Sequence, residues 1–132
     1  MTGATHISIG AALGAIIKNP ALAFTAGVIS HIITDALPHR DFSPEIEAIL
    51  TTAAIGAIIG YYGFDSPQFW GALGAIVPDI DHALAETGLI HPSSEFFPTH
   101  IANGKYHGQD TNEKLSQLLL TIAAISVAEL GD

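Results

Sequence analysis

Residues 19–38 have the sequence NPALAFTAGVISHIITDALP, and this stretch decides the fold class. Asn19 is a favoured helix N-cap, and Pro20 suits the first helical position, where the missing N–H costs nothing. The apolar run that follows is rich in Ala, Leu and Ile and is too long for a strand. Pro38 cannot continue the helix. The stretch therefore predicts one helix over Asn19–Leu37.

The same start signal recurs along the chain. Ser43-Pro44 and Ser66-Pro67 each precede an apolar run. We expect helices over Thr5–Lys18, Asn19–Leu37, Ser43–Tyr62, Ser66–Val77 and Asn112–Leu130, with a loop over Leu89–Thr111. Pro78 either kinks the fourth helix or starts a new helical turn that continues to Ala85. The prediction is an all-α, compact bundle of about five short apolar helices with a His/Asp site between helices.

Composition narrows the function classes. The chain has 132 residues, within the usual size of one domain, so residues 1–132 are expected to form a single domain. It contains no Cys, which excludes disulfides, thiolate zinc sites and a cysteine nucleophile. The formal net charge is −9 with only 4 Lys+Arg, so no basic stripe for nucleic acid exists. Any metal ion must therefore be held by His and carboxylate groups.

Low charge raises the question of a membrane. Charged residues are 13% of the chain, about half the ~25% typical of soluble domains. The longest uncharged run is Ala48–Phe64, at the lower edge of the roughly 17–25 residues that span a bilayer. The start of the chain has no positively charged region and so does not resemble a signal peptide. The sequence predicts a cytoplasmic or membrane-associated protein, and leaves homo-oligomerisation open.

Small residues recur at helical spacing. Gly10 and Gly14, and likewise Gly56 and Gly60, would lie on one face of their helices. We interpret both pairs as positions of tight packing inside a small bundle.

Histidines and carboxylates interrupt the apolar segments, where an unpaired ionisable group is costly. His31 and Asp35 are four residues apart and share one helix face, so they could hold one cation or simply hydrogen-bond to each other. Asp79 and His82 have the i, i+3 carboxylate–histidine spacing of metal sites in helical bundles. Acids at this position also suit a helix N-terminus without any metal.

Further candidates are weaker. His6 lies at the start of the first helix, and His39 follows Pro38, at a helix end from which it could face the same site as Asp35. Asp41 is equally suited to capping the next segment. We include the loop residues His100 and His107 among the candidate metal ligands. The full set is His6, His31, Asp35, His39, Asp79, His82, His100 and His107.

Three motifs carry a family resemblance. Thr5-His6 with Gly10-Ala11-Ala12-Leu13-Gly14, Ser30-His31-x3-Asp35-x2-Pro38-His39 and Val77-Pro78-Asp79-Ile80-Asp81-His82 resemble the membrane-associated metal-dependent hydrolases, also described as LexA-binding, inner-membrane-associated hydrolases. The resemblance covers about residues 1–110. It implies an all-helical hydrolase with a His/Asp metal site. The matching positions carry over His6, His31, Asp35, Asp79, Asp81 and His82 as the site.

One part of the family pattern is missing. Family members commonly have an Arg-x-x-Thr-His-Ser-like stretch after the Asp-His element, whereas this chain has only Pro98-Thr99-His100. The departure concerns the half of the site that would face the substrate.

A mechanism follows from these expectations. Imidazole and carboxylate ligands suit Zn²⁺, our first choice, and also Mn²⁺ or Fe²⁺, and the number of candidates allows two ions. Metal-activated water would be the nucleophile, Asp81 the general base, and Arg40 a helper in stabilising charge. The expected substrate is a small-molecule or lipid phosphoester.

Two non-catalytic alternatives remain open. In the first, the same residues bind metal structurally in an oligomeric or membrane-associated protein. In the second, buried His–Asp pairs tie the helices together without a metal, as fully satisfied polar networks can.

Overall fold

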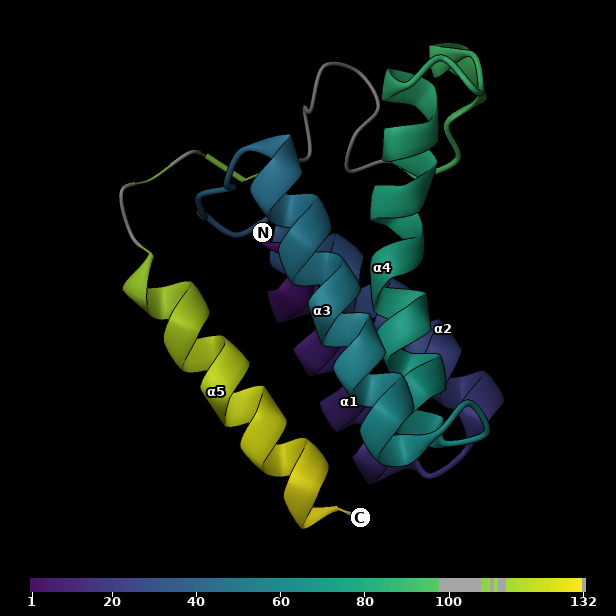
Figure 1. Cartoon of the computed structure of the whole chain (residues 1–132), viewed down its shortest axis with the longest axis vertical. Helices are drawn as coiled ribbons and strands as arrows, with labels where there is room; N and C mark the ends of the chain where they lie inside the picture. The colour runs from purple at the N-terminus through teal and green to yellow at the C-terminus, as the bar shows by residue number, and fades with distance from the viewer. Residues whose placement is uncertain (98–107, 110, 112–113, 132) are drawn as a thin grey trace.

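A computed structural model describes residues 1–97, 108–109, 111 and 114–131. These residues form five α-helices and no β-strand (Figure 1). The helices are α1 (Gly3–Ile17), α2 (Pro20–Asp35), α3 (Pro44–Tyr62), α4 (Pro67–Glu86) and α5 (Leu115–Leu130), with one 3-10 turn, η1 (Pro92–Ser94). The predicted all-α bundle of about five helices is confirmed.

Local capping explains most helix starts. The side chains of Thr2, Asn19 and Ser66 accept hydrogen bonds from backbone N–H groups in the first turns of α1, α2 and α4. Proline begins α2, α3 and α4, as the sequence predicts. At the start of α3, hydrogen bonds from its own backbone and from the Ser43 hydroxyl lower the pKa of Glu45.

Two boundaries differ from expectation. The second helix ends at Asp35 rather than Leu37, and α1 begins at Gly3 because Thr2 caps it. The fourth helix passes through Pro78 and continues to Glu86. Proline has no N–H to donate, so the helix lacks the hydrogen bond that residue 78 would otherwise make to the Gly74 carbonyl. Asp79 consequently lies inside a helix and not at the start of one.

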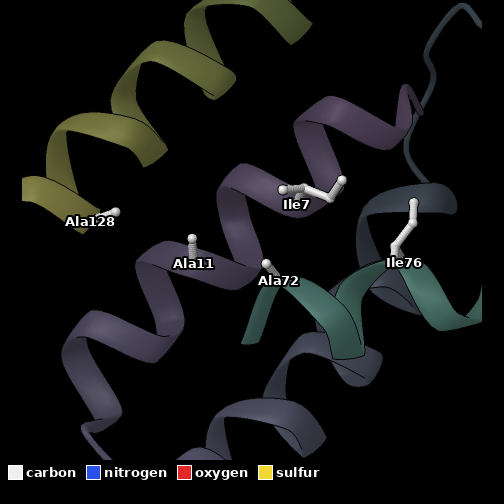
Figure 2. Close-up of a cluster of buried hydrophobic side chains, with 5 residues drawn as sticks. All are labelled: Ile7, Ala11, Ala72, Ile76 and Ala128. Atoms are coloured by element: carbon white, nitrogen blue, oxygen red, sulfur yellow. The ribbon is translucent and has the colours of Figure 1, made fainter. Parts of the chain in front are cut away.

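The N-terminal helix α1 is the centre of the bundle. It packs against the other four α-helices, while α5 makes its main contacts with α1 and lies apart from α3 (Figure 1). The buried cluster comprises Ile7, Ala11, Ala72, Ile76 and Ala128, from α1, α4 and α5 (Figure 2). Full burial of one isoleucine stabilises the fold by roughly 1.5–3 kcal/mol. Alanine supplies most of this core, so its total contribution is modest.

Glycine allows α1, α2 and α4 to approach closely. A Cβ at Gly10 would clash with the backbone carbonyl of Gly71, and one at Gly74 would clash with the carbonyl of Phe24. Gly14 is similarly enclosed by Pro67. Tight packing is thus confirmed for α1. The prediction of tight packing is wrong for α3, because a Cβ at Gly56 or Gly60 would have nothing within 4 Å among the described residues.

Large apolar side chains lie mostly on the outside. No residue of α3 is buried, and Ile49 and Tyr61 are 68% and 72% exposed. The outer surface of α5 presents Leu118, Leu119 and Ile122. Among the described helices, only α3 is long and apolar enough to cross a membrane. Small residues are inside and large apolar residues outside, the reverse of a typical soluble bundle.

Candidate metal centre

Three helices bring the candidate ligands together. His6 lies in the first half of α1, His31 and Asp35 occupy the last turns of α2, and Asp79 follows Pro78 in α4. The close approach of these helices, described above, buries three of the four side chains. His6, His31 and Asp35 are each 1% exposed or less.

We call His6, His31 and Asp79 the imidazole cluster. Each of the three offers one ligand atom, and these atoms lie within 4.8 Å of one another. The two rings stack with centroids 3.9 Å apart. Nε2 of His31 lies 3.6 Å from Oδ1 of Asp79. Asp79 is the outermost member, since its side chain is 30% exposed, whereas the Nε2 atoms of both rings are buried.

Asp35 borders the cluster from α2. Its Oδ1 is 3.4 Å from Nε2 of His6, and its Oδ2 is 4.0 Å from Nε2 of His31. The carboxylate therefore lies close to both imidazoles.

Hydrogen bonds fix which nitrogen of each ring is protonated. Nδ1 of His31 lies 2.7 Å from the carbonyl of Ala75, which can only accept, so Nδ1 carries the hydrogen. The hydroxyl of Thr34 donates to the carbonyl of Ser30, so it accepts from Nδ1 of His6 at 3.2 Å. In the neutral ring of His31, Nε2 then carries a lone pair and lies 3.6 Å from Oδ1 of Asp79.

Burial keeps His31 neutral. Desolvation, followed by the nearby His6 ring, lowers its pKa from 6.5 to about 4, although Asp79 and Asp35 oppose the shift. Nε2 of His6 is buried and makes no hydrogen bond among the described residues. A buried polar atom without a hydrogen bond destabilises the fold unless a ligand binds to it.

The donor set fits a divalent metal ion. Nitrogen ligands and carboxylate oxygens bind Zn²⁺ at about 2.0–2.2 Å, which places neighbouring tetrahedral ligands roughly 3.3 Å apart. In the imidazole cluster, Nε2 of His31 and Oδ1 of Asp79 are 3.6 Å apart and all three ligand atoms lie within 4.8 Å, so an ion would draw the ligands closer together. Metal-binding histidines usually donate their second N–H to a carbonyl or other acceptor, as both rings do here.

His39 lies next to this centre without belonging to the imidazole cluster. Its Nε2 is 3.7 Å from Oδ1 of Asp35 and 3.4 Å from Oδ1 of Asp41. Its Nδ1 donates to the carbonyl of Leu37 at 2.7 Å. Arg40 follows it in the chain and is exposed.

Other predicted residues lie elsewhere. His82 contacts Glu95 at 3.4 Å and Glu86 at 3.5 Å, and it is not in the imidazole cluster. Asp81 accepts hydrogen bonds from the N–H groups of Phe96 and Phe97, which ties the loop after η1 to α4. The roles of Asp81 as general base and of Arg40 stay predictions. His100 and His107 lie outside the described residues.

The sequence analysis missed two groups at the centre. Thr34 orients His6, and its position between His31 and Asp35 in the chain was the available signal. The terminal amino group of Met1 lies 2.7 Å from Oδ1 of Asp35, a contact that no sequence pattern indicates because it joins the chain end to α2.

No family model, curated protein or solved structure matches this chain. The family resemblance therefore stays a prediction, and the functional argument depends on the geometry of the centre.

Proposed function

We propose that this protein is a metal-dependent hydrolase of phosphoesters. The observation that carries the proposal is the pair of buried imidazoles in the cluster, whose Nδ1 sides are engaged and whose Nε2 atoms face Asp79 and Asp35. The resemblance to the membrane-associated metal-dependent hydrolases supports the same assignment. A purely packing role would not require the unprotonated Nε2 of His31 to lie beside the carboxylate of Asp79.

In this proposal His6, His31 and Asp79 hold the ion, and Asp35 stands beside them. Zn²⁺ is the first choice for this donor set, and Mn²⁺ or Fe²⁺ would also fit. When bound, such an ion supplies a water whose pKa is lowered to about 7 and stabilises negative charge on a phosphoryl group. The chain's own residues fix the donors: Ala75 and Thr34 hold the rings, and burial keeps His31 neutral.

The partly exposed Asp79 marks the side from which a substrate would approach. Acidic residues dominate the neighbourhood, with Asp41, Asp81, Glu86 and Glu95 on the same or adjoining segments. An anionic phosphoester would be repelled by these groups unless metal ions neutralised part of the charge. The proposed catalysis therefore depends on the metal for substrate binding as well as for chemistry.

A second candidate function is structural metal binding. The imidazole cluster joins α1, α2 and α4, so one ion there would cross-link the helices that form the core. Such a site would stabilise the fold without turnover. Phosphoesterase assays on metal-loaded protein separate the two candidates.

We also propose that the protein associates with a membrane. Two stretches contain no charged residue: Ala48–Phe64, which covers most of α3 and the residues just after it, and Leu115–Ala128 of α5. Many of their large apolar side chains are exposed. Exposed large apolar side chains in such numbers favour a membrane or protein contact. A lipid phosphoester would then reach the metal centre from the bilayer. The competing explanation for the exposed apolar side chains is a homo-oligomer, in which they would contact other copies of the chain.

The first experiment measures metal content per chain in tag-free protein by elemental mass spectrometry. Variants His6→Gln, His31→Gln and Asp79→Asn are compared with His91→Gln, which alters an exposed histidine whose side chain hydrogen-bonds to Ser93. We expect wild type and His91→Gln to retain metal, and each cluster variant to lose at least about tenfold in affinity, equivalent to about 1.4 kcal/mol. Equal metal content in all proteins would contradict the metal centre.

Hydrolysis is then measured on a chromogenic phosphodiester and phosphomonoester with the same proteins. Turnover in wild type and His91→Gln, with loss in the cluster variants and after chelation, is the expected result. Bound metal without turnover of any phosphoester would favour the structural function.

A further inference from the structure

The first turn of α5 carries a buried amide that the proposed function does not use. Gln117 is 6% exposed, and the other buried residues of α5 are the alanines Ala124 and Ala128. A buried amide destabilises the fold unless its donor and its acceptor both have hydrogen-bond partners. Gln117 has both, and each partner lies outside α5.

The Gln117 amide joins the start of α1 to the segment that follows α2. Its Oε1 accepts from the backbone N–H of Thr2 at 3.0 Å, and its Nε2 donates to the carbonyl of Arg40 at 2.6 Å. Thr2 is the N-cap of α1, and Arg40 comes shortly after α2 ends at Asp35. One side chain of α5 therefore restrains two segments that are far apart in the sequence.

The hydrogen bond to Thr2 is continued by one to His6. The carbonyl of Thr2 accepts from the backbone N–H of His6 at 3.2 Å. Nε2 of His6 in turn lies 3.4 Å from Oδ1 of Asp35. A displacement of Thr2 would thus move the first turn of α1 and change the position of the His6 ring.

A second side chain of α5 supports the same turn of α1. The hydroxyl of Thr121 donates to the carbonyl of Gln117 at 2.8 Å, so it accepts from the hydroxyl of Thr5 at 2.9 Å. Gln117 and Thr121 are four residues apart and share one face of α5. Because Thr5 directly precedes His6, α5 holds α1 by polar contacts at the turn that leads to the imidazole cluster.

The hydrogen bond to Arg40 restrains a segment that also approaches Asp35. Arg40 follows His39, whose Nε2 lies 3.7 Å from Oδ1 of Asp35. The same carboxylate oxygen lies 3.4 Å from Nε2 of His6. Both segments that Gln117 joins therefore contact Asp35, and the amide limits how far they can move apart.

We propose that Gln117 is a positioning residue for the metal centre, because its amide fixes His6 of α1 relative to the candidate ligands on α2. The inference rests on the proposed function and names a residue that touches neither the ion nor the substrate. A binding site requires its ligands to be held within about 0.5 Å of the productive geometry. Loss of the amide should therefore weaken metal binding in a chain that still folds.

The test replaces Gln117 with methionine, which is similar in length and helix propensity but forms neither hydrogen bond. The matched control is Ala128→Gly, which weakens the same helix within the buried cluster and keeps Gln117. Urea unfolding of the metal-free proteins measures their stability. Competition with a chromogenic chelator measures the Zn²⁺ affinity under conditions in which every protein is folded.

We expect Gln117→Met to lower the Zn²⁺ affinity at least about tenfold, the effect typical of residues that orient metal ligands. The visible absorption spectrum of bound Co²⁺ should also change, because it reports the geometry of the ligands. Ala128→Gly should lose stability but keep the wild-type affinity and spectrum. The spectrum separates the two roles, since it arises only from folded chains with bound metal.

A second variant covers the case in which Gln117→Met does not fold. Gln117→Glu can still accept from the N–H of Thr2, but its carboxylate cannot donate to the carbonyl of Arg40. This variant should likewise bind Zn²⁺ more weakly than wild type.

Three results would overturn the positioning role. Wild-type affinity and spectrum in the folded Gln117 variants would make Gln117 a structural residue of α5 and leave the metal centre intact. Equal weakening by Ala128→Gly would assign the effect to the docking of α5 as a whole. Absence of bound Zn²⁺ in wild type would reject the positioning role together with the proposed function.

Discussion

The His31 imidazole is uncharged at neutral pH, because burial and the neighbouring His6 ring lower its pKa to about 4. The neutral state has two consequences for the molecule. It leaves Nε2 able to bind a metal ion, and it makes the stability of the metal-free protein dependent on pH.

The pH dependence has a definite sign. The unfolded chain takes up a proton at His31 near pH 6.5, whereas the folded chain resists it until about pH 4. This contribution to stability is complete above pH 6.5 and is lost as the pH falls to about 4. The full loss is about 3 kcal/mol, from 1.36 kcal/mol per pKa unit.

Urea unfolding of chelator-treated protein between pH 7.5 and 4 measures this loss. Other groups titrate over the same pH range, so the prediction concerns the difference in stability loss between wild type and the variants. His91→Gln should lose as much stability as wild type, and His31→Gln should lose about 3 kcal/mol less. The same slope in all three proteins would show that His31 is not the responsible group.

At the scale of helices, the centre depends on how closely α1, α2 and α4 pack. Gly10 and Gly71 bring the backbones of α1 and α4 together, and Gly27 of α2 approaches the same Gly71 carbonyl. Larger residues at these positions would separate the helices that carry His6, His31 and Asp79. Gly56 of α3 is the natural control, because it has the same spacing to a second glycine but no neighbour within 4 Å.

We expect Gly10→Ala to destabilise the fold by about 1–3 kcal/mol, since a backbone carbonyl cannot move aside for the new methyl group. Gly56→Ala should instead stabilise α3 by up to about 1 kcal/mol, because alanine is the better helix former. Unfolding free energies of the two variants check both signs. A large destabilisation by Gly56→Ala would mean that another chain packs against α3.

At the scale of the whole molecule, charge and apolar surface are separated along the bundle axis. Asp35, Asp41, Glu45, Glu47 and Lys114 belong to the helix ends or connections at the end that contains the metal centre. Lys18, Asp65 and Glu129 belong to the opposite end. Helices α3 and α5, which carry exposed large apolar side chains, run between these two ends (Figure 1). A bilayer could accept this apolar band while the centre stays near its polar surface.

Flotation with uncharged phosphatidylcholine vesicles tests the membrane contact. The protein should float with the vesicles at both low and high salt, because apolar burial and not charge attraction provides the binding. Replacement of Leu119 and Ile122 by Glu should abolish flotation, whereas Glu45→Gln should leave it unchanged. A monodisperse oligomer that needs no detergent and does not float would instead assign the surface to contacts between copies of the chain.

The sequence by itself determined the helical fold and its approximate boundaries, and its eight candidate ligands included the His6, His31 and Asp79 that the structure brings together. These features are local: Asn19-Pro20 and Ser66-Pro67 specify helix starts, and the spacing of His31 and Asp35 specifies a shared helix face. The same spacing argument also selected His82, which contacts Glu86 and Glu95 instead.

Only the tertiary structure decided which of the candidates meet. Helical period fixes a residue's face relative to its neighbours in sequence, but not which other helix that face contacts. The approach of Gly10 to Gly71, the alignment of Ala75 with His31 and the placement of Met1 beside Asp35 all join residues that are tens of positions apart. Such contacts depend on the packing of whole helices. The same packing buries His6 and His31 and leaves His91 exposed.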